Sequence, residues 1–156
     1  MSLPPFQALL DVNRADVYRF LVASVGPSEA DDCFQETCIA ALRAYPRLER
    51  ATNLRAWLFR IAERKAIDAH RARGRRAVPV EEVPEQAVAD GGAGNSEPAL
   101  WAAVRRLPSK QRTAVFCRSA LGMPYPQLAD LLECSEDAAR RNVHEGLKRL
   151  REEWRG

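Results

Sequence analysis

Three acidic residues and two cysteines near residue 35 are the side chains whose types would allow catalysis. Asp31, Asp32 and Glu36 are possible metal ligands, and Cys33 or Cys38 is a possible nucleophile. A reactive cysteine needs a base beside it, and no histidine stands near either cysteine in the sequence. The sequence also lacks a His-Glu-x-x-His motif, a glycine-rich phosphate loop and paired Glu-x-x-His motifs. It therefore predicts no enzyme, no metal and no cofactor.

Basic residues indicate a different function, because they gather in two places. The formal net charge of +3 is too small to predict nucleic-acid binding by itself. One cluster closes the first half of the chain at residues 71–76, and the other lies between residues 140 and 151. Arginine and lysine concentrated on one helix attract phosphates, so both segments are candidate nucleic-acid-binding surfaces.

Apolar residues at helical spacing predict three N-terminal helices. The first series runs from Phe6 to Leu21 and must end at Gly26-Pro27, and the second runs from Ala30 to the break at Pro46. Asn53 is a suitable cap for a third helix. Its predicted buried side comprises Leu54, Trp57, Leu58, Ile61 and Ala62, and its predicted exposed stripe carries Arg60, Arg64 and Arg71.

The composition changes abruptly after this helix. Residues 77–98 contain prolines, glycines and acidic side chains but no basic residue, and they are too poor in apolar residues to form a core. This segment is predicted to be a flexible acidic linker between two lobes.

The C-terminal part has the spacing of a helix-turn-helix. A short helix over 126–132, a turn at 133–135 and a long helix to Trp154 follow one another. Ser135 is a suitable cap for the long helix, whose predicted buried stripe is Ala139, Val143, Leu147, Leu150 and Trp154. Its outward side chains are Arg140, Arg141, His144 and Lys148.

The predicted fold is therefore all-α, with two small helical domains at 1–76 and 99–156 joined by the linker at 77–98. No apolar run approaches the about 20 residues that cross a bilayer, and the N-terminus lacks the features of a signal peptide, so we expect a cytoplasmic protein. Its cysteines are expected to be reduced and structural, although a redox or zinc switch using Cys117 and Cys134 stays open.

Three runs, in order, give the chain a family resemblance. They are Asp31-Asp32-x-x-Gln35-Glu36-Thr37, Arg55-Ala56-Trp57-Leu58-Phe59-Arg60-Ile61-Ala62, and Leu107-Pro108-x-x-x-Arg112 at the entry to the helix-turn-helix. In order and spacing the chain resembles a bacterial RNA polymerase sigma factor of the extracytoplasmic-function (ECF) group. Such a factor binds core RNA polymerase and directs promoter recognition, DNA melting and transcription initiation.

The resemblance implies roles for particular residues. In that family the second helix docks on the β′ clamp helices of core polymerase, here through Asp31, Asp32, Gln35 and Glu36, and the C-terminal lobe binds the β flap. Recognition and melting of the minus-ten box are assigned to Arg47, Asn53, Arg60, Arg64 and Arg71. Recognition of the minus-thirty-five box is assigned to Arg140, Arg141, Asn142, His144 and Lys148. Family members commonly carry an amide where this chain has Arg64, which changes the expected minus-ten preference.

The resemblance further implies an anti-sigma partner and a linker that occupies the basic channel taken later by RNA. One alternative is a stand-alone helix-turn-helix regulator that binds duplex DNA as a dimer without polymerase. The acidic and amide surface at Gln35 and Glu36 argues against it, because such a regulator has no use for that surface.

Overall fold

The computed structural model describes residues 3–49, 53–76 and 97–155, and no strand occurs among them. Its elements are α1 (Phe6–Val25), α2 (Pro27–Ala44), the 3-10 helix η1 (Tyr45–Arg47), α3 (Leu54–Arg76), α5 (Glu97–Arg106), α6 (Ser109–Val115), the π-helical turn η2 (Phe116–Ala120), α7 (Tyr125–Leu132) and α8 (Glu136–Arg155). The all-α prediction is confirmed. The predicted acidic linker falls outside the described residues, except for its last two positions, where α5 begins.

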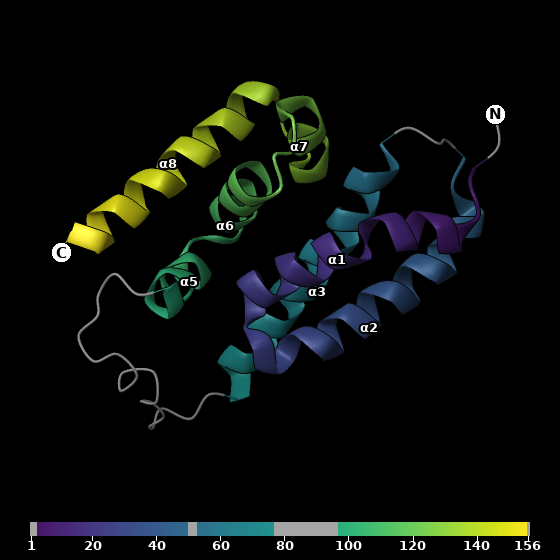
Figure 1. Ribbon diagram of the computed structural model, residues 1–156, viewed down its shortest axis with the longest axis horizontal. Coiled ribbons are helices and arrows are strands. Elements are labelled where there is room, and N and C mark those ends of the chain that lie inside the picture. Colours follow the sequence, from purple (N-terminus) through teal and green to yellow (C-terminus); the bar gives the residue numbers. More distant parts are fainter. Residues whose placement is uncertain (1–2, 50–52, 77–96, 156) are drawn as a thin grey trace.

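The N-terminal lobe is the bundle of α1, α2 and α3 (Figure 1). Gly26 separates α1 from α2 and has φ +92°, a conformation that residues with a side chain rarely adopt. The chain therefore reverses sharply there, and α1 and α2 pack side by side. Val17, Phe20 and Leu21 are almost completely buried in this bundle.

A polar contact aligns α3 with α1. Nη1 of Arg55 donates a 2.6 Å hydrogen bond to Oδ1 of Asn13, and Nη2 lies 3.2 Å from Oδ2 of Asp16. The Asn13 side chain is only 3% exposed, and its Nδ2 donates to the Leu9 carbonyl at 3.0 Å. The buried amide is thus satisfied on both sides, as a polar group in a core must be.

The C-terminal lobe contains α5 to α8 and includes the predicted helix-turn-helix, α7 and α8. Glu133 ends α7 in the left-handed conformation, with φ 57°. The Ser135 hydroxyl then accepts a 3.0 Å hydrogen bond from the backbone N–H of Ala138, which confirms the predicted cap. Ala139, Val143 and Leu150 are buried as predicted, and Leu147 is partly buried. The side chain of Trp154 lies outside the described part of the chain.

Helix α8 lies unusually close to α6. A Cβ atom added at Gly146 would stand 2.5 Å from Cγ2 of Val115 and 3.3 Å from the carbonyl oxygen of Gln111. Only glycine fits at this crossing without a shift of its neighbours, which explains a glycine in the middle of a long helix.

The two lobes share one continuous core. The Phe20 ring of α1 lies 5.8 Å from Phe59 of α3 and 6.0 Å from Phe116 of η2, measured between ring centroids. Trp101 of α5 lies 5.9 Å from Phe116 in the same way. The apolar spacing of the sequence did not predict this contact between lobes, which we call the junction.

The junction also explains an error in the predicted buried side of α3. The buried residues are Ala56, Leu58, Phe59, Ala62, Glu63 and Ala66, whereas Trp57 and Ile61 are only partly buried. Helix α3 packs against α1 and α2 on one side and against α7 on another. Its buried stripe is therefore wider than that of a helix with one buried face, and it is centred on Phe59.

Candidate nucleic-acid interface

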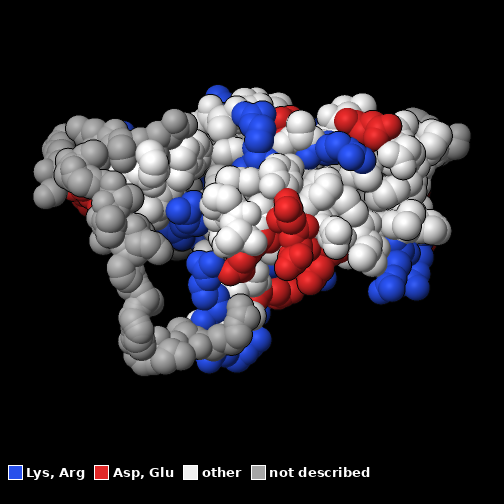
Figure 2. Space-filling model, turned by 60° about the horizontal axis from the view of Figure 1, so that its bottom comes forward, with Lys and Arg blue, Asp and Glu red and all other residues white. Residues whose placement is uncertain are grey.

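The predicted partner-binding face is present on α2. Asp32, Gln35 and Glu36 are exposed and lie at helical spacing on one side. Asp31 is also exposed, but its Oδ1 accepts a 2.8 Å hydrogen bond from the Tyr18 hydroxyl of α1. Figure 2, in which the bottom of the Figure 1 view comes forward, shows acidic side chains gathered near the middle of that face. Asp31 is therefore tied to α1, whereas Asp32, Gln35 and Glu36 are exposed to solvent.

Two apolar residues continue this face. Ile39 is 49% exposed and Leu42 is 56% exposed, although both have large hydrophobic side chains. They stand three and six residues after Glu36, so the same side of α2 is acidic at its start and apolar toward its end. Ile39 and Leu42 were not predicted from the sequence, although apolar residues on the polar side of an amphipathic helix indicate a contact surface.

The cysteines are in surroundings that suppress their reactivity. Burial, together with the nearby carboxylates of Glu29, Glu36 and Asp32, raises the pKa of Cys33 to about 11. Cys117 is completely buried, and burial raises its pKa even more strongly. A thiol with a raised pKa is a poor nucleophile at neutral pH. All four cysteines are free, and no cluster of three metal-ligating side chains occurs among the described residues.

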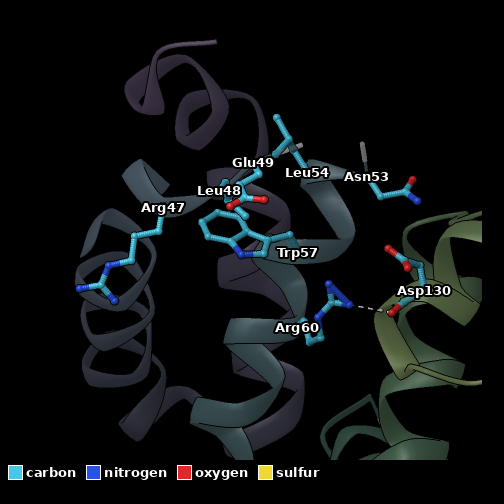
Figure 3. A pocket seen from close by; sticks show the side chains of 8 residues that line it. All are labelled: Arg47, Leu48, Glu49, Asn53, Leu54, Trp57, Arg60 and Asp130. Carbon is cyan, nitrogen blue, oxygen red and sulfur yellow. Dashed lines mark hydrogen bonds between the residues drawn. The ribbon is translucent and has the colours of Figure 1, made fainter. Parts of the chain in front are cut away.

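A cavity of about 620 Å³ lies where the loop before α3 meets α7. Its lining residues are Arg47, Leu48, Glu49, Asn53, Leu54, Trp57, Arg60 and Asp130. Figure 3 shows Trp57 and Arg60 facing the centre of this group, Asp130 approaching from the C-terminal lobe, and the guanidinium of Arg47 pointing away. The structure thus brings Asn53, Arg60 and an aromatic side chain together at one cavity. Asn53 precedes α3 as predicted, in the left-handed conformation with φ 52°.

The arginines of α3 are not equivalent. Arg64 and Arg71 are exposed, as predicted. Arg60 is only partly exposed, because its Nη1 donates a 2.8 Å hydrogen bond to the carbonyl oxygen of Asp130. The prediction of one exposed stripe is therefore wrong for Arg60, because α7 packs against this side chain and covers part of it. Arg64 also approaches α7, with its Nη2 4.0 Å from Oε2 of Glu133.

The outward residues of α8 form the second basic surface. Arg140, Arg141, His144 and Lys148 are exposed, as predicted. Asn142 is partly buried, and its Nδ2 donates a 3.1 Å hydrogen bond to the Ala138 carbonyl one turn earlier. One of the two N–H groups of its side-chain amide is therefore occupied within α8.

Aromatic stacking holds one arginine of this surface. The Arg140 guanidinium carbon lies 4.6 Å from the ring centroid of Tyr125, and that of Arg118 lies 4.1 Å from the same centroid. Both distances are typical of a cation–π contact. Arg140 also lies 3.8 Å from the carboxylates of Glu136 and Asp137. Tyr125 and Arg118 were not predicted from the sequence. Their contact joins segments separated by a turn, so it produces no periodic pattern of residue types.

Comparisons with known proteins agree with this arrangement. Residues 9–76 match the family model of Sigma-70 region 2, and residues 98–150 match that of Sigma-70, region 4. The chain is 35% identical to the ECF RNA polymerase sigma factor SigD of Mycobacterium tuberculosis, over 93% of this chain and 74% of that protein. It is 29% identical to the ECF RNA polymerase sigma factor SigX of Bacillus subtilis, over 94% of this chain and 81% of that protein.

A solved structure is similar over nearly the whole chain. The sigma factor RpoE, solved in complex with the anti-sigma factor NepR from Bartonella quintana, superposes with a TM-score of 0.74 at 25% identity, over 96% of both chains. CnrH, solved with the cytosolic domain of CnrY, superposes with a TM-score of 0.66 at 21% identity, which supports the fold alone.

The two family matches, one over the three-helix lobe and one over the helix-turn-helix lobe, make this chain a sigma factor of the sigma-70 class. This chain belongs to the ECF group of that family. It is a DNA-binding factor that acts with RNA polymerase in transcription initiation, so the resemblance seen in the sequence is confirmed and a stand-alone regulator is not favoured. Sigma factors are non-enzymatic, which is consistent with the prediction of no catalysis. None of the described helices is long and apolar enough to cross a membrane.

Proposed function

We propose that this sigma factor docks on the β′ clamp helices of core RNA polymerase through the α2 face formed by Asp31, Asp32, Gln35 and Glu36. The observation that carries the proposal is the exposure of Asp32, Gln35 and Glu36 on one side of α2. Two carboxylates one turn apart repel each other modestly on an isolated helix, and a basic partner surface removes that cost. Ile39 and Leu42 extend the contact with apolar area.

The N-terminal lobe then recognises the minus-ten box through Arg47, Asn53, Arg60, Arg64 and Arg71. The cavity beside Trp57 supports this assignment, because opened DNA needs a recess for unstacked bases next to cations that hold phosphates. Arg64 and Arg71 are exposed for phosphate contacts along α3.

The C-terminal lobe recognises the minus-thirty-five box from α8, through Arg140, Arg141, Asn142, His144 and Lys148. Four of these side chains are exposed on one helix, which has a diameter suited to a major groove. Tyr125 and Arg118 position the Arg140 guanidinium through their stacking. The same lobe contacts the polymerase β flap.

The remaining parts of the proposal follow from the family. The domains are 1–76 and 99–156, and the linker at 77–98 passes through the basic channel that RNA later enters. RpoE was solved with an anti-sigma factor, and an anti-sigma protein is the corresponding partner here. The factor acts in the cell interior, where the polymerase is.

Co-elution with purified core polymerase tests the docking face. Glu36→Lys reverses one charge on this face and should abolish co-elution, because it places a cation against a basic partner. Asp11→Lys is the matched control, since it makes the same charge change at an exposed site on α1. Equal retention of both variants by the polymerase would contradict the proposal.

A further inference from the structure

A cavity of about 290 Å³, separate from the one beside Trp57, lies between α1 and the segments α5 and η2. Helix α5 lies beside the C-terminal part of α1 (Figure 1). The wall formed by α1 comprises Tyr18, Arg19, Val22 and Ala23. The facing wall comprises Trp101, Phe116 and Ala120. These residues belong neither to the proposed polymerase-binding face nor to the proposed DNA-binding surfaces, so the proposed function gives this cavity no role.

Three of the lining side chains are aromatic, and contacts outside the cavity hold them in place. Trp101 and Phe116 lie 5.9 Å apart between ring centroids, with 57° between their planes. Tyr18 is held by α2, because its ring meets that of Phe34 edge-on at 5.8 Å and its hydroxyl donates a 2.8 Å hydrogen bond to Asp31. Rings that are already ordered bind a planar apolar molecule without a further cost in side-chain entropy.

The wall formed by η2 has an uncommon backbone conformation. Phe116–Ala120 form a π-helical turn directly after α6, and both of its end residues line the cavity. Such turns are rare, and they occur frequently at functional sites. The π-helical turn is therefore a sign of a binding site that does not depend on the apolar character of the lining.

The rim carries a positive charge that its neighbours neutralise only in part. Among the described lining residues, only Arg19 is charged, and its side chain is 55% exposed. Its Nη1 lies 2.8 Å from Oδ1 of Asp16. The other oxygen of that carboxylate, Oδ2, lies 3.2 Å from Nη2 of Arg55. Two guanidinium groups thus share one carboxylate, and the surplus positive charge attracts an additional anion at the rim.

The size and lining of the cavity indicate the class of its occupant. Sites for small molecules typically measure about 300 to 1,000 Å³ and are lined by apolar and aromatic side chains with a few polar groups. This cavity is close to the lower limit of that range. We propose that it binds a small aromatic carboxylate, whose rings lie between Tyr18, Trp101 and Phe116 and whose carboxylate meets Arg19.

Naphthalene-2-carboxylate is a suitable probe, because it joins two fused aromatic rings to one carboxylate. Titration calorimetry on the full chain should detect its binding. The neutral analogue naphthalene-2-carboxamide has the same rings without the charge. It should bind about three- to fivefold more weakly, which is the loss expected for one exposed ion pair.

Two substitutions test the walls and the rim separately. Ala120→Leu fills the cavity from an exposed position and should weaken probe binding at least about tenfold, whereas Ser119→Leu adds the same side chain to an exposed neighbour outside the lining and should bind like the wild type. Arg19→Gln should remove the preference for the carboxylate over the carboxamide. Arg14→Gln, at an exposed arginine of α1 outside the cavity, should keep that preference.

The indole N–H signal of Trp101 locates the bound probe. In proton–nitrogen correlation spectra this signal, identified by its loss in Trp101→Phe, should move during the titration. The signal of Trp57 should stay in place, because Trp57 lines the other cavity.

Each contrary result overturns a defined part of the proposal and leaves promoter recognition untouched. Equal affinities of Ala120→Leu and Ser119→Leu, or movement of the Trp57 signal alone, would place the probe outside this cavity. Equal binding of carboxylate and carboxamide by the wild type would overturn the anionic class of the ligand. Absence of heat and of signal changes up to the solubility limit of the probe would show that the cavity is not a site for aromatic carboxylates.

Discussion

Glu63 of α3 and Thr113 of α6 face each other across the junction, and both side chains are buried. The hydroxyl of Thr113 favours the charged form of the carboxyl group, although it does not form a hydrogen bond of ordinary geometry. An ionisable group thus lies in the contact between the two lobes. The stability of the junction should therefore depend on pH.

The direction of that dependence follows from the pKa of Glu63. Burial raises this pKa, and Glu133 raises it further, while Thr113, Lys110 and Arg112 lower it. A carboxyl group whose pKa is raised in the junction stabilises the contact between the lobes below its ordinary pKa, and this contribution is lost as pH rises through the raised value. The radius of gyration should therefore increase with pH.

The variant Glu63→Gln isolates this effect, because it cannot titrate. Burial lowers the pKa of His70, and Arg112 at the junction lowers it further. His70 therefore has the opposite pH dependence and destabilises the contact between the lobes as pH falls. The wild type should expand more than Glu63→Gln as pH is raised from about 4 to 8, in scattering profiles of both proteins. Identical profiles would exclude a contribution from Glu63.

Removal of the Tyr125 ring should weaken binding to the minus-thirty-five box. Tyr125→Leu eliminates the stacking under Arg140 and Arg118, and an exposed cation–π contact contributes about 0.5 to 1 kcal/mol. We expect a two- to fivefold loss of affinity for duplex DNA, measured by anisotropy at fixed salt. Tyr125→Phe keeps the ring and should bind like the wild type. A loss of equal size in both variants would assign the effect to the hydroxyl group instead.

Gly146→Ala should destabilise the protein, although alanine is the better helix former. The gain in helix propensity is about 1 kcal/mol, whereas overpacking typically costs 1 to 3 kcal/mol, and the new methyl group would stand 2.5 Å from Cγ2 of Val115. Urea denaturation should show a net loss of about 1 kcal/mol.

The double variant with Val115→Ala tests this explanation. Deletion of the valine methyl groups relieves the closest contact, so Gly146→Ala should cost less in that background than in the wild type. Equal costs in the two backgrounds would show that the glycine is required for another reason.

Local signals in the sequence predicted most elements of each lobe. The break at Gly26-Pro27, the Ser135 cap and the α8 stripe depend on neighbours along the chain, and the structure agrees with all three over the side chains that it describes. The exposed face of α2 and the outward arginines of α8 were predicted for the same reason. The periodicity of apolar residues in a helix indicates a single buried side, and each of these helices has a single buried side.

The junction was not predicted, because it depends on contacts between distant segments. Helix α3 is covered from two directions, so a search for one apolar stripe placed Trp57 in the core and Arg60 in solvent. Glu63 is charged, so the sequence did not predict that it would be buried, yet it is only 7% exposed. The sequence therefore indicated where the candidate binding residues lie, but not the contacts that cover some of them.

Run-off transcription with purified core polymerase and a promoter library tests the central claim most directly. The account predicts accurate starts with the wild type, and Arg140→Ala and Arg64→Ala should each alter preference at a different box. If Arg140 contacts a guanine edge, its loss should cost about 1 to 3 kcal/mol and relax selectivity at that position. Absence of any accurate start with the wild-type chain, or one identical shift in preference for both variants, would contradict the account.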